Sequence, residues 1–157
     1  AISPHMAAER DGRRLDVGEI VGFCRFAGPA EGGATMLVEG IGGAMVPLSD
    51  DETVLDWMAG LSWPVLVVAG SYLGSLSHTL TAIESIRLRG LELAGIVVSE
   101  SEENPVPVIE TAETIGRFVA PAPVIVLPRI NPVHLTNESV PDIAAALGLM
   151  GSAPSTV

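Results

Sequence analysis

Four short apolar runs, each rich in branched aliphatic residues or glycine, constrain the fold of this chain more than any other feature. They are Thr35 to Val38, Val65 to Ala69, Gly95 to Val98 and Val124 to Leu127. Their apolar residues are continuous rather than alternating with polar ones, which is typical of strands buried on both faces of a parallel sheet. We therefore predict four such strands.

Segments with helical signals lie between these runs. Acidic residues open the segment from Asp50 to Leu61, as a helix N-terminus prefers, and Gly90 is a natural cap for Ser77 to Arg89. Helical spacing recurs from Pro105 to Val119, and a short closing helix is expected from Val140 to Leu147. Because strands and helices alternate, the pattern predicts an α/β fold with helices on both faces of a parallel sheet.

Two further helices are expected near the N-terminus. Ser3 and Pro4 fit an N-cap and a first helical position, and Asp16 is expected to cap a helix that runs to about Phe26. We expect one α/β domain over residues 1–150. Residues 151–157 are mostly small and polar, which predicts a disordered tail.

Composition excludes several classes of function. The net charge of -11 over 157 residues repels phosphate backbones and anionic lipid, so neither nucleic acid nor a membrane is an expected partner. The single cysteine, Cys24, rules out an internal disulfide, fits a reducing compartment and is interpreted as a small buried residue. The stretch from Trp57 to Ile83 lacks charged residues, but Pro64 and several glycines and serines interrupt it, which favours a strand, a loop and a helix start over a membrane span.

The basic residues exclude one common nucleotide-binding motif from this chain. All eight are arginines, and no lysine occurs. The phosphate-loop signature G-x-x-x-x-G-K-[ST] needs a lysine that reaches the terminal phosphates of a bound nucleotide. The 157 residues therefore do not contain this signature.

Glu39 comes directly after the first apolar run and before three nearby glycines, Gly40, Gly42 and Gly43. In doubly wound sheets, ligands bind beyond the carboxyl ends of the strands. A carboxylate there can hold Mg²⁺ directly or through water, and glycines let backbone N–H groups approach an anion closely. The alternative is a solvated glutamate in a turn whose glycines only satisfy backbone geometry. The residues alone leave both interpretations open.

A second loop, GSYLGSLSHTL at residues 70–80, follows the second apolar run and opens a helix. The start of a helix offers free N–H groups and a positive dipole end, so Ser75, Ser77 and the backbone there could bind a carboxylate or a phosphate. The alternative is that Ser77 is an ordinary N-cap. His78 would then lie in the first turn, either as a proton carrier or contact, or as a solvated or packed histidine.

Other reactive clusters are not supported. No arrangement of residues typical of a nucleophilic triad or of a His and Cys metal site is evident in the sequence. The glutamate-rich SESEENP at residues 99–105 is interpreted as a solvated loop, and His134 is assigned no role.

Two central motifs resemble those of the dethiobiotin synthetase family. VEGIGGAMVPLSDDETVLDW at residues 38–57 is followed by WPVLVVAGSYLGSLSHTLTAIESIRLRGLELAGIVVS at residues 63–99. The earlier SPHMAAERDGRRLD at residues 3–16 is similar to an S-P-H-x-A-A segment of the same family. The resemblance covers Ser3 to about Leu147.

The resemblance implies a P-loop NTPase-like fold and a cytoplasmic, ATP-dependent ligase of biotin biosynthesis. Such enzymes close the ureido ring of dethiobiotin from 7,8-diaminopelargonic acid (7,8-diaminononanoate), CO2 and ATP with Mg²⁺, through a phosphorylated carbamate. The family is normally a homodimer with its active site at the interface. The expected partners are therefore these small molecules and a second subunit.

The resemblance also implies roles for single residues. Glu39 matches the Mg²⁺-binding glutamate, and Gly42 and Gly43 match the loop beside the reacting amines. Ser99 and Pro128 fall near positions that flank the nucleotide base. Ser99 departs from the family pattern, because an adenine-reading asparagine is common there, and a serine lacks the second polar group of an amide.

A further set of residues matches the segment that reaches the tail carboxylate of a substrate bound to the other subunit. This segment comprises Gly74, Ser75, Ser77 and His78. Ser77 departs from the family motif, which has asparagine at this position, so substrate preference is expected to differ.

The family's phosphate loop, catalytic lysines and first strands are expected before Ala1. Two explanations are open: the numbered sequence starts after a segment of the protein, which we favour, or the chain is a half-domain that needs a partner chain. A non-catalytic, degenerate homologue and a related P-loop amide ligase of the cobyrinic acid synthase type are the alternative functions. Activity with diaminopelargonic acid would separate the two enzyme hypotheses.

Overall fold

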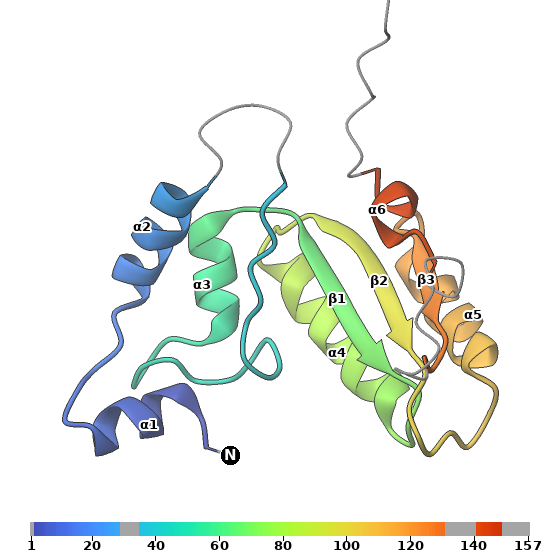
Figure 1. Cartoon of the computed structure of the whole chain (residues 1–157), viewed down its shortest axis with the longest axis horizontal. Helices are drawn as coiled ribbons and strands as arrows, with labels where there is room; N and C mark the ends of the chain where they lie inside the picture. Colours follow the sequence, from blue (N-terminus) through green and yellow to red (C-terminus); the bar gives the residue numbers. More distant parts are fainter. Residues whose placement is uncertain (1, 29–34, 131–140, 149–157) are drawn as a thin grey trace, which may run out of the picture. The chain divides into compact units, whose positions relative to one another are not determined.

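A computed structural model describes residues 2–28, 35–130 and 141–148 of the chain. The chain divides into two compact units. Unit 1 comprises Ala1–Pro64 and Ser85–Glu92, and unit 2 comprises Val65–Glu84 and Leu93–Val157. Figure 1 labels their helices and strands. The expectation of one domain over residues 1–150 stays a prediction, and the tail over residues 151–157 lies outside the described residues.

Unit 2 contains a sheet of three parallel strands in the order β1-β2-β3. The strands are β1 (Val65–Gly70), β2 (Leu93–Ser99) and β3 (Val124–Leu127). They correspond to three of the four apolar runs. The predicted α/β fold with a parallel sheet is therefore confirmed.

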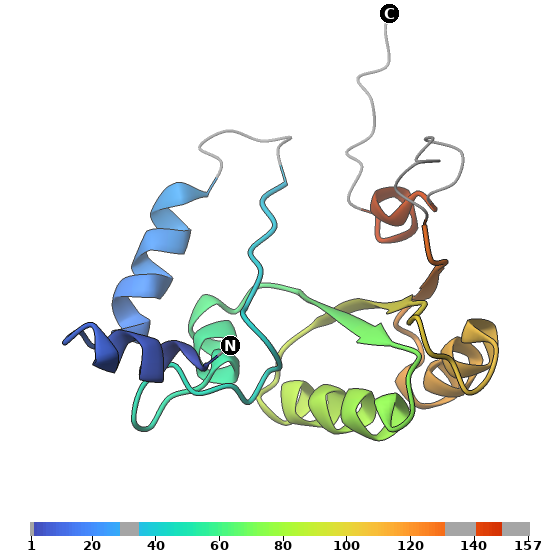
Figure 2. The same cartoon turned by 60° about the horizontal axis from the view of Figure 1, so that its bottom comes forward.

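One face of this sheet is covered by α4 (Ser75–Leu88) and α5 (Val108–Val119). Figure 2 shows α4 beneath β1 and β2. Both helices contribute to one hydrophobic core with the strands, whose buried members are Ala69, Ile83, Ile96, Val98, Ala112, Ile115 and Val119. Burial of these apolar side chains stabilises the unit by removing their surface from water.

The other face of the sheet meets α6 (Ile143–Ala146). Successive residues of a strand point to opposite faces, so Gly95 lies on the face opposite to Ile96. A methyl group at Gly95 would lie 2.5 Å from the side chain of Leu147, which caps α6. Helices therefore lie on both faces, as predicted.

Among the described strands, only β2 has its central residues buried on both faces. Ile96, Val97 and Val98 are at most 3% exposed, whereas Val68 of β1 is 68% exposed and all four residues of β3 are half-buried. The prediction of burial on both faces is thus right for β2 and wrong for β1 and β3. These two strands are the outer strands of the described sheet, so each has a neighbouring strand on one side only.

Unit 1 contains α1 (Pro4–Arg10), α2 (Val17–Ala27) and α3 (Val54–Leu61). Ser3 is the N-cap residue of α1, and the Asp16 side chain caps α2 by accepting the backbone N–H of Glu19 at 2.9 Å. Both N-terminal helices were predicted with these caps. Cys24 of α2 is buried, as expected.

A capping box sets the start of α3 at Val54 rather than at the predicted Asp50. The backbone N–H and the hydroxyl of Thr53 both donate to the Asp56 carboxylate, at 2.8 and 2.7 Å. Arg89 lies 2.7 Å from the same carboxylate. The hydrogen bonds from Thr53, helped by Arg89, hold the pKa of Asp56 below its ordinary value. The acids before Thr53 lie in a turn, where the N–H of Leu48 donates to the carbonyl of Glu52 at 2.8 Å.

The other helix bounds differ from the predicted ones by a few residues. Helix α4 begins at Ser75, two residues before the predicted start, and ends at Leu88, one residue before the predicted Arg89. Gly90 has a φ of +70° in the turn that follows. Helix α5 begins at Val108 because the prolines before it lack the N–H that a helix interior requires. Within the described residues, none of the helices combines the length and the apolar character that crossing a membrane requires.

The predicted strand from Thr35 to Val38 is wrong. Residues 35–40 form neither helix nor strand, and Leu37 is 76% exposed. A strand needs a neighbour that pairs with its N–H and C=O groups, and no described strand pairs with this run. Its apolar composition is therefore not sufficient to make it a strand.

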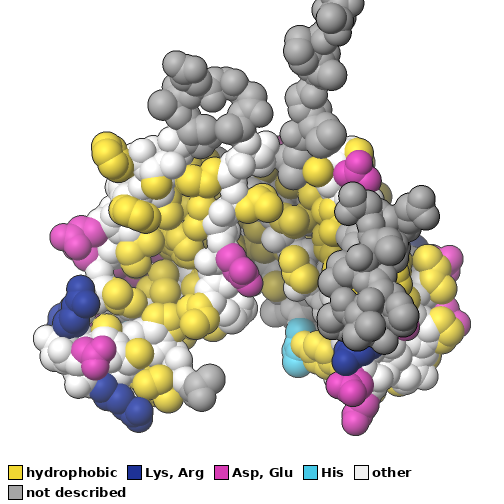
Figure 3. All heavy atoms as spheres, viewed as in Figure 1, with side chains coloured by type: hydrophobic (Ala, Val, Ile, Leu, Met, Phe, Trp, Pro, Cys, Tyr) yellow, Lys and Arg dark blue, Asp and Glu magenta, His cyan; other side chains and the backbone are white. Residues whose placement is uncertain are grey.

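Both tryptophans of the chain belong to unit 1. Trp57 packs against a core formed by Val17, Leu48 and Val54. Its indole N–H is buried and has no acceptor among the described residues. Figure 3 shows hydrophobic side chains at the surface over α2 and α3, and the exposed residues of α2 include Phe23 and Phe26.

Candidate functional site

The carboxyl ends of the three strands meet at one edge of the sheet in unit 2, because the strands are parallel. Ser71 follows β1, Ser99 ends β2 and Pro128 follows β3. Ser99 is in register with Gly70 on one side and with Leu127 on the other, so the loops that follow begin side by side. Ligands of open α/β sheets bind at this edge. We therefore take it as the candidate site of unit 2.

Ser99 and Pro128, which the resemblance places beside a nucleotide base, come together at this edge. Ser99 is half-buried, and Pro128 is the exposed residue after its register partner Leu127. Glu100, the residue after β2, donates its backbone N–H to the carbonyl of Leu127 at 2.9 Å and fixes the two chain segments to each other. The serine hydroxyl can donate one hydrogen bond and accept others. Its role towards a nucleotide stays a prediction.

The segment from Gly74 to His78 lies at the same edge, where α4 begins. Gly74 has a φ of +93°, a left-handed conformation that favours glycine. Its carbonyl accepts the N–H of His78 at 3.1 Å, so the turn leads directly into the helix. Ser75 is buried, whereas Ser77 is exposed and lies inside α4. The interpretation of Ser77 as an ordinary N-cap is therefore wrong.

His78 is exposed at the start of α4 and contacts Tyr72. The Tyr72 hydroxyl lies 3.4 Å from His78 Nδ1, and the ring centroids are 6.2 Å apart. Both side chains therefore form one polar, solvent-accessible group beside the helix start. Exposure contradicts the interpretation of His78 as a packed residue and is compatible both with a ligand contact and with a solvated side chain.

Sequence reasoning missed part of this edge. It treated residues 99–105 as a solvated loop, which holds for the exposed Glu102 and Glu103 but not for Glu100, Ser101 and Asn104. These three are half-buried and make hydrogen bonds to one another or to neighbouring loops. One signal could have found them: short polar residues follow two neighbouring parallel strands directly.

The remaining predicted site residues lie in unit 1. Glu39 is exposed and belongs to the segment of residues 35–40, so the strand expected to end at it is absent. Gly42 has a φ of +74°, and a methyl group there would lie 2.9 Å from Val46 Cγ2. A methyl group at Gly43 would meet no atom within 4 Å. The roles of Glu39, Gly42 and Gly43 stay predictions.

A lone carboxylate such as Glu39 fits Mg²⁺ better than it fits most other metals. Among the described residues, no group of three or more His, Cys, Asp and Glu side chains could hold a metal ion. Mg²⁺ rarely needs such a group, because it keeps several waters and is bound by one or two carboxylates together with substrate phosphates. The exposed oxygens of Glu39 are open to an ion of this kind.

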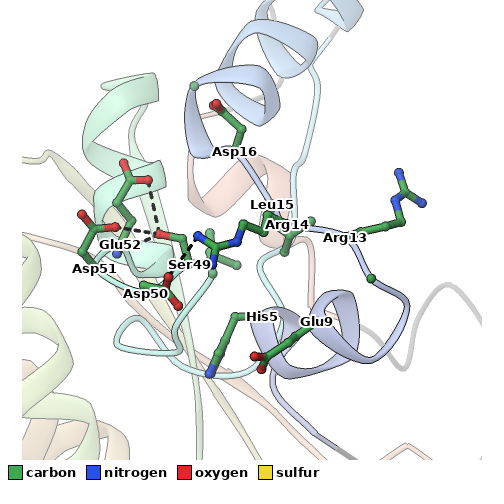
Figure 4. A pocket seen from close by; sticks show the side chains of 13 residues that line it. His5, Glu9, Arg13, Arg14, Leu15, Asp16, Ser49, Asp50, Asp51 and Glu52 are labelled. Atoms are coloured by element: carbon green, nitrogen blue, oxygen red, sulfur yellow. Dashed lines mark hydrogen bonds and ion pairs between the residues drawn. The ribbon is translucent and has the colours of Figure 1, made fainter.

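Unit 1 also has a hollow of about 490 Å³ between α1, the turn after it and residues 48–52. Figure 4 shows its charged side chains of both signs. Arg14 Nη1 lies 3.3 Å from the Asp50 carboxylate, and His5 Nδ1 lies 3.3 Å from the carbonyl of Pro47. Arg14 and Asp50 are almost fully exposed, so their pairing adds little stability. Five carboxylates against two arginines give the hollow an excess of negative charge, which disfavours an anion.

Comparison with known proteins agrees with the fold and with the motifs. A family model described as "AAA domain" matches residues 1–140. An "ATP-dependent dethiobiotin synthetase BioD" of Acidiphilium cryptum is 48% identical over 127 residues, which are 78% of this chain and 54% of the relative. Proteins of the same name from Methylobacterium nodulans and Caulobacter vibrioides are 45% and 41% identical, over 74% and 82% of this chain.

The chain spans about half the length of these curated relatives, with 52% and 58% of the latter two covered. The family match covers most of the 157 residues and agrees with a P-loop NTPase-like α/β fold. The chain therefore belongs to the AAA domain family, and the resemblance to dethiobiotin synthetases found in its sequence is confirmed.

Proposed function

We propose that this chain takes part in the ATP-dependent closure of the dethiobiotin ureido ring from 7,8-diaminononanoate and CO2. The observation that carries the proposal is the meeting of Gly74 to His78 with Ser99 and Pro128 at one edge of a parallel sheet. The names of the similar proteins, ATP-dependent dethiobiotin synthetases, support the same reaction. In this proposal the protein is a cytoplasmic ligase of biotin biosynthesis.

The loop before α4 would bind the carboxylate at the tail of the diamine. Helix α4 has 14 residues, and its first turn offers free backbone N–H groups and the positive end of the helix dipole. The exposed Ser77 and His78 can add hydrogen bonds to the same carboxylate. In the proposed homodimer, these residues reach a substrate bound to the other subunit.

Ser99 and Pro128 would flank the base of the nucleotide. The half-buried hydroxyl of Ser99 offers one hydrogen bond to a base edge, and the exposed Pro128 offers an apolar surface. An asparagine would offer both a donor and an acceptor at the position of Ser99. We therefore propose a weaker discrimination between ATP and GTP than an asparagine would give.

Glu39 would bind Mg²⁺, and the backbone at Gly42 and Gly43 would lie beside the reacting amines. When bound, Mg²⁺ supplies charge neutralisation for phosphate oxygens. The glycines leave space for the backbone to approach the substrate, and Gly43 has no neighbour within 4 Å of the position of a side chain. Ring closure needs the second amine to be held close to the carbamate, so positioning is the main task of these residues.

The test measures dethiobiotin formation. The protein is purified from the organism that makes it, so that any further part of the chain and any partner chain stay with these 157 residues. Wild type is compared with Glu39→Gln and with the matched control Glu92→Gln, an exposed glutamate of the same unit. We expect the rate to fall by about 100-fold or more in Glu39→Gln, because the Mg²⁺ that would neutralise the phosphate charge in the transition state loses its carboxylate ligand. The rate should be unchanged in Glu92→Gln.

Three other results would redirect the proposal. Equal rates for the two glutamate variants would remove Glu39 from the site. Folded wild-type protein that forms no dethiobiotin, but forms an amide from a carboxylic acid, an ammonia donor and ATP, would favour the related amide ligase. Folded protein that binds neither ATP nor the diamine would favour a non-catalytic chain that needs a partner.

A further inference from the structure

Two serines tie the loop after β1 to the loop after β2. Ser71 donates its backbone N–H to Ser101 Oγ at 3.0 Å, and Ser101 donates its backbone N–H to Ser71 Oγ at 2.9 Å. Each hydroxyl thus accepts the backbone N–H of the other residue. This reciprocal pair holds the backbones of two loops at a fixed separation.

Asn104 completes the hydrogen bonding of the pair. The Ser71 hydroxyl donates to Asn104 Oδ1, and Asn104 Nδ2 donates to the carbonyl of Ser101 at 2.9 Å. Ser71 is only 1% exposed, so water cannot replace a partner that it loses. The buried hydroxyl therefore has its donor and one acceptor position satisfied within this cluster.

Glu100 extends the connection to the loop after β3. One of its oxygens accepts from Asn104 Nδ2 at 3.4 Å, and the other accepts the backbone N–H of Arg129 at 2.9 Å. The loops after all three strands are thus joined by one chain of hydrogen bonds. In this chain of hydrogen bonds, the Glu100 carboxylate joins Asn104 to the loop after β3.

The residue before Ser71 has no room for a side chain. A methyl group at Gly70 would lie 2.9 Å from Ser101 Oγ and 2.7 Å from the ring of Tyr72. Tyr72, Asn104 and Pro105 also line a shallow hollow of about 450 Å³. The two loops therefore come close together at the pair and open into a hollow beside it.

We propose that Ser71 and Ser101, with Asn104, are positioning residues that couple nucleotide binding to diamine binding. The inference depends on the proposed function, in which Ser99 contacts the nucleotide and the segment that starts at Gly74 contacts the diamine. Ser101 is two residues after Ser99, and Ser71 is three residues before Gly74. A nucleotide that fixes one loop would thereby fix the other, and the diamine would bind to an already ordered loop.

The first test needs no ligand. Amide hydrogen exchange is measured by NMR on wild type, Ser71→Ala and Ser101→Ala. Because the bonds are reciprocal, Ser71→Ala should speed exchange of the Ser101 amide, and Ser101→Ala that of the Ser71 amide, by about 5-fold to 10-fold for one hydrogen bond lost. The control, Thr114→Ala, removes a hydroxyl that accepts from Arg117 on α5 and should change neither amide. Unchanged exchange at both amides would overturn the pair as a link between the loops.

The second test measures the coupling between nucleotide binding and diamine binding. It uses the protein purified together with any further part of the chain and any partner chain. The dissociation constant of 7,8-diaminononanoate is determined with and without a non-hydrolysable ATP analogue and Mg²⁺, and the ratio of the two constants is the coupling factor. We expect Ser71→Ala and Ser101→Ala to reduce this factor towards one, and Ser101→Thr, which keeps the hydroxyl, to restore it. A purely structural loss would weaken binding in both states and leave the factor unchanged.

The outcomes separate this inference from the proposed function. Wild type that binds neither ligand would overturn the proposed function, and the coupling with it. Wild type with a clear coupling factor that both alanine variants keep would overturn only the positioning role. If Ser71→Ala does not fold, Ser101→Ala and Asn104→Ala give the same answer, because both residues are half-buried and lie in the loop after β2.

Discussion

Two apolar runs of four residues behave in opposite ways. Residues 124–127 form β3, pair with β2 and pack against the core of unit 2, whereas residues 35–38 of unit 1 pair with no described strand. Both runs are mainly apolar, so apolar character alone does not explain the difference. A neighbouring strand supplies hydrogen-bond partners for the backbone and a surface for alternate side chains. A neighbouring strand that can pair with it therefore decides whether an apolar run becomes a strand.

We expect the greatest loss of stability in a comparison of one isoleucine from each unit. Ile115 of α5 is fully buried in the core, and Ile41 of unit 1 is 62% exposed. Ile115→Ala should lower the free energy of unfolding by about 2–5 kcal/mol, since it removes buried surface and leaves a cavity. Ile41→Ala should change it by less than about 0.5 kcal/mol. Urea unfolding followed by far-UV circular dichroism measures both, and similar losses would contradict the assigned cores.

A second comparison uses one glycine from each unit. Gly70→Ala places a methyl group against Tyr72 and Ser101, so we expect a loss of about 1–3 kcal/mol in the free energy of unfolding. Gly43→Ala meets no atom within 4 Å and should leave stability unchanged. Thermal unfolding measures the two effects. A loss of dethiobiotin formation in the stable Gly43→Ala protein would then report on the reaction itself.

The two runs themselves can be compared through one valine each. Val126 of β3 packs against the core, and Val38 is 39% exposed. We expect Val126→Ala to cost about 1–2 kcal/mol of unfolding free energy, because two methyl groups of a half-buried side chain that packs against the core are lost. Val38→Ala should cost clearly less. Equal costs would show that residues 35–38 are buried in the protein as it exists in solution.

The smallest effect concerns the capping box of unit 1 and depends on pH. Thr53→Ala removes a hydrogen bond to Asp56 and should cost about 0.5–2 kcal/mol at neutral pH. The pKa of Asp56 is lower in the folded protein than its ordinary value of 3.8. The stabilisation is therefore present above that value and is lost as the pH falls through the lowered pKa.

The measurement for this prediction is the unfolding free energy of wild type and Thr53→Ala at neutral pH and at the lowest pH where both remain folded. The difference between the two proteins should shrink in acid. Arg89→Gln is the companion variant, because Arg89 contributes less to the lowered pKa than Thr53 does. If the difference in unfolding free energy between the two proteins stays constant with pH, Thr53 does not stabilise the protein through its hydrogen bond to Asp56.

The sequence predicted unit 2 better than unit 1. Continuous apolar runs predicted β1, β2 and β3. Ser99 and Pro128 were named only through the family resemblance, and the structure has them at one edge of the sheet. The reasoning from apolar runs failed for residues 35–38, because periodicity reports the character of a segment and not the presence of a neighbour. The link between Ser71 and Ser101 was not predictable either, since it joins residues 30 positions apart through the register of two strands.

The distribution of aromatic residues gives each unit its own optical signal. Both tryptophans belong to unit 1, and the single tyrosine, Tyr72, belongs to unit 2. Tryptophan emission therefore follows the unfolding of unit 1, whereas circular dichroism follows the helices of both units. Coincident transitions would mean that the chain unfolds as one cooperative domain, and separate transitions would mean that each unit melts by itself.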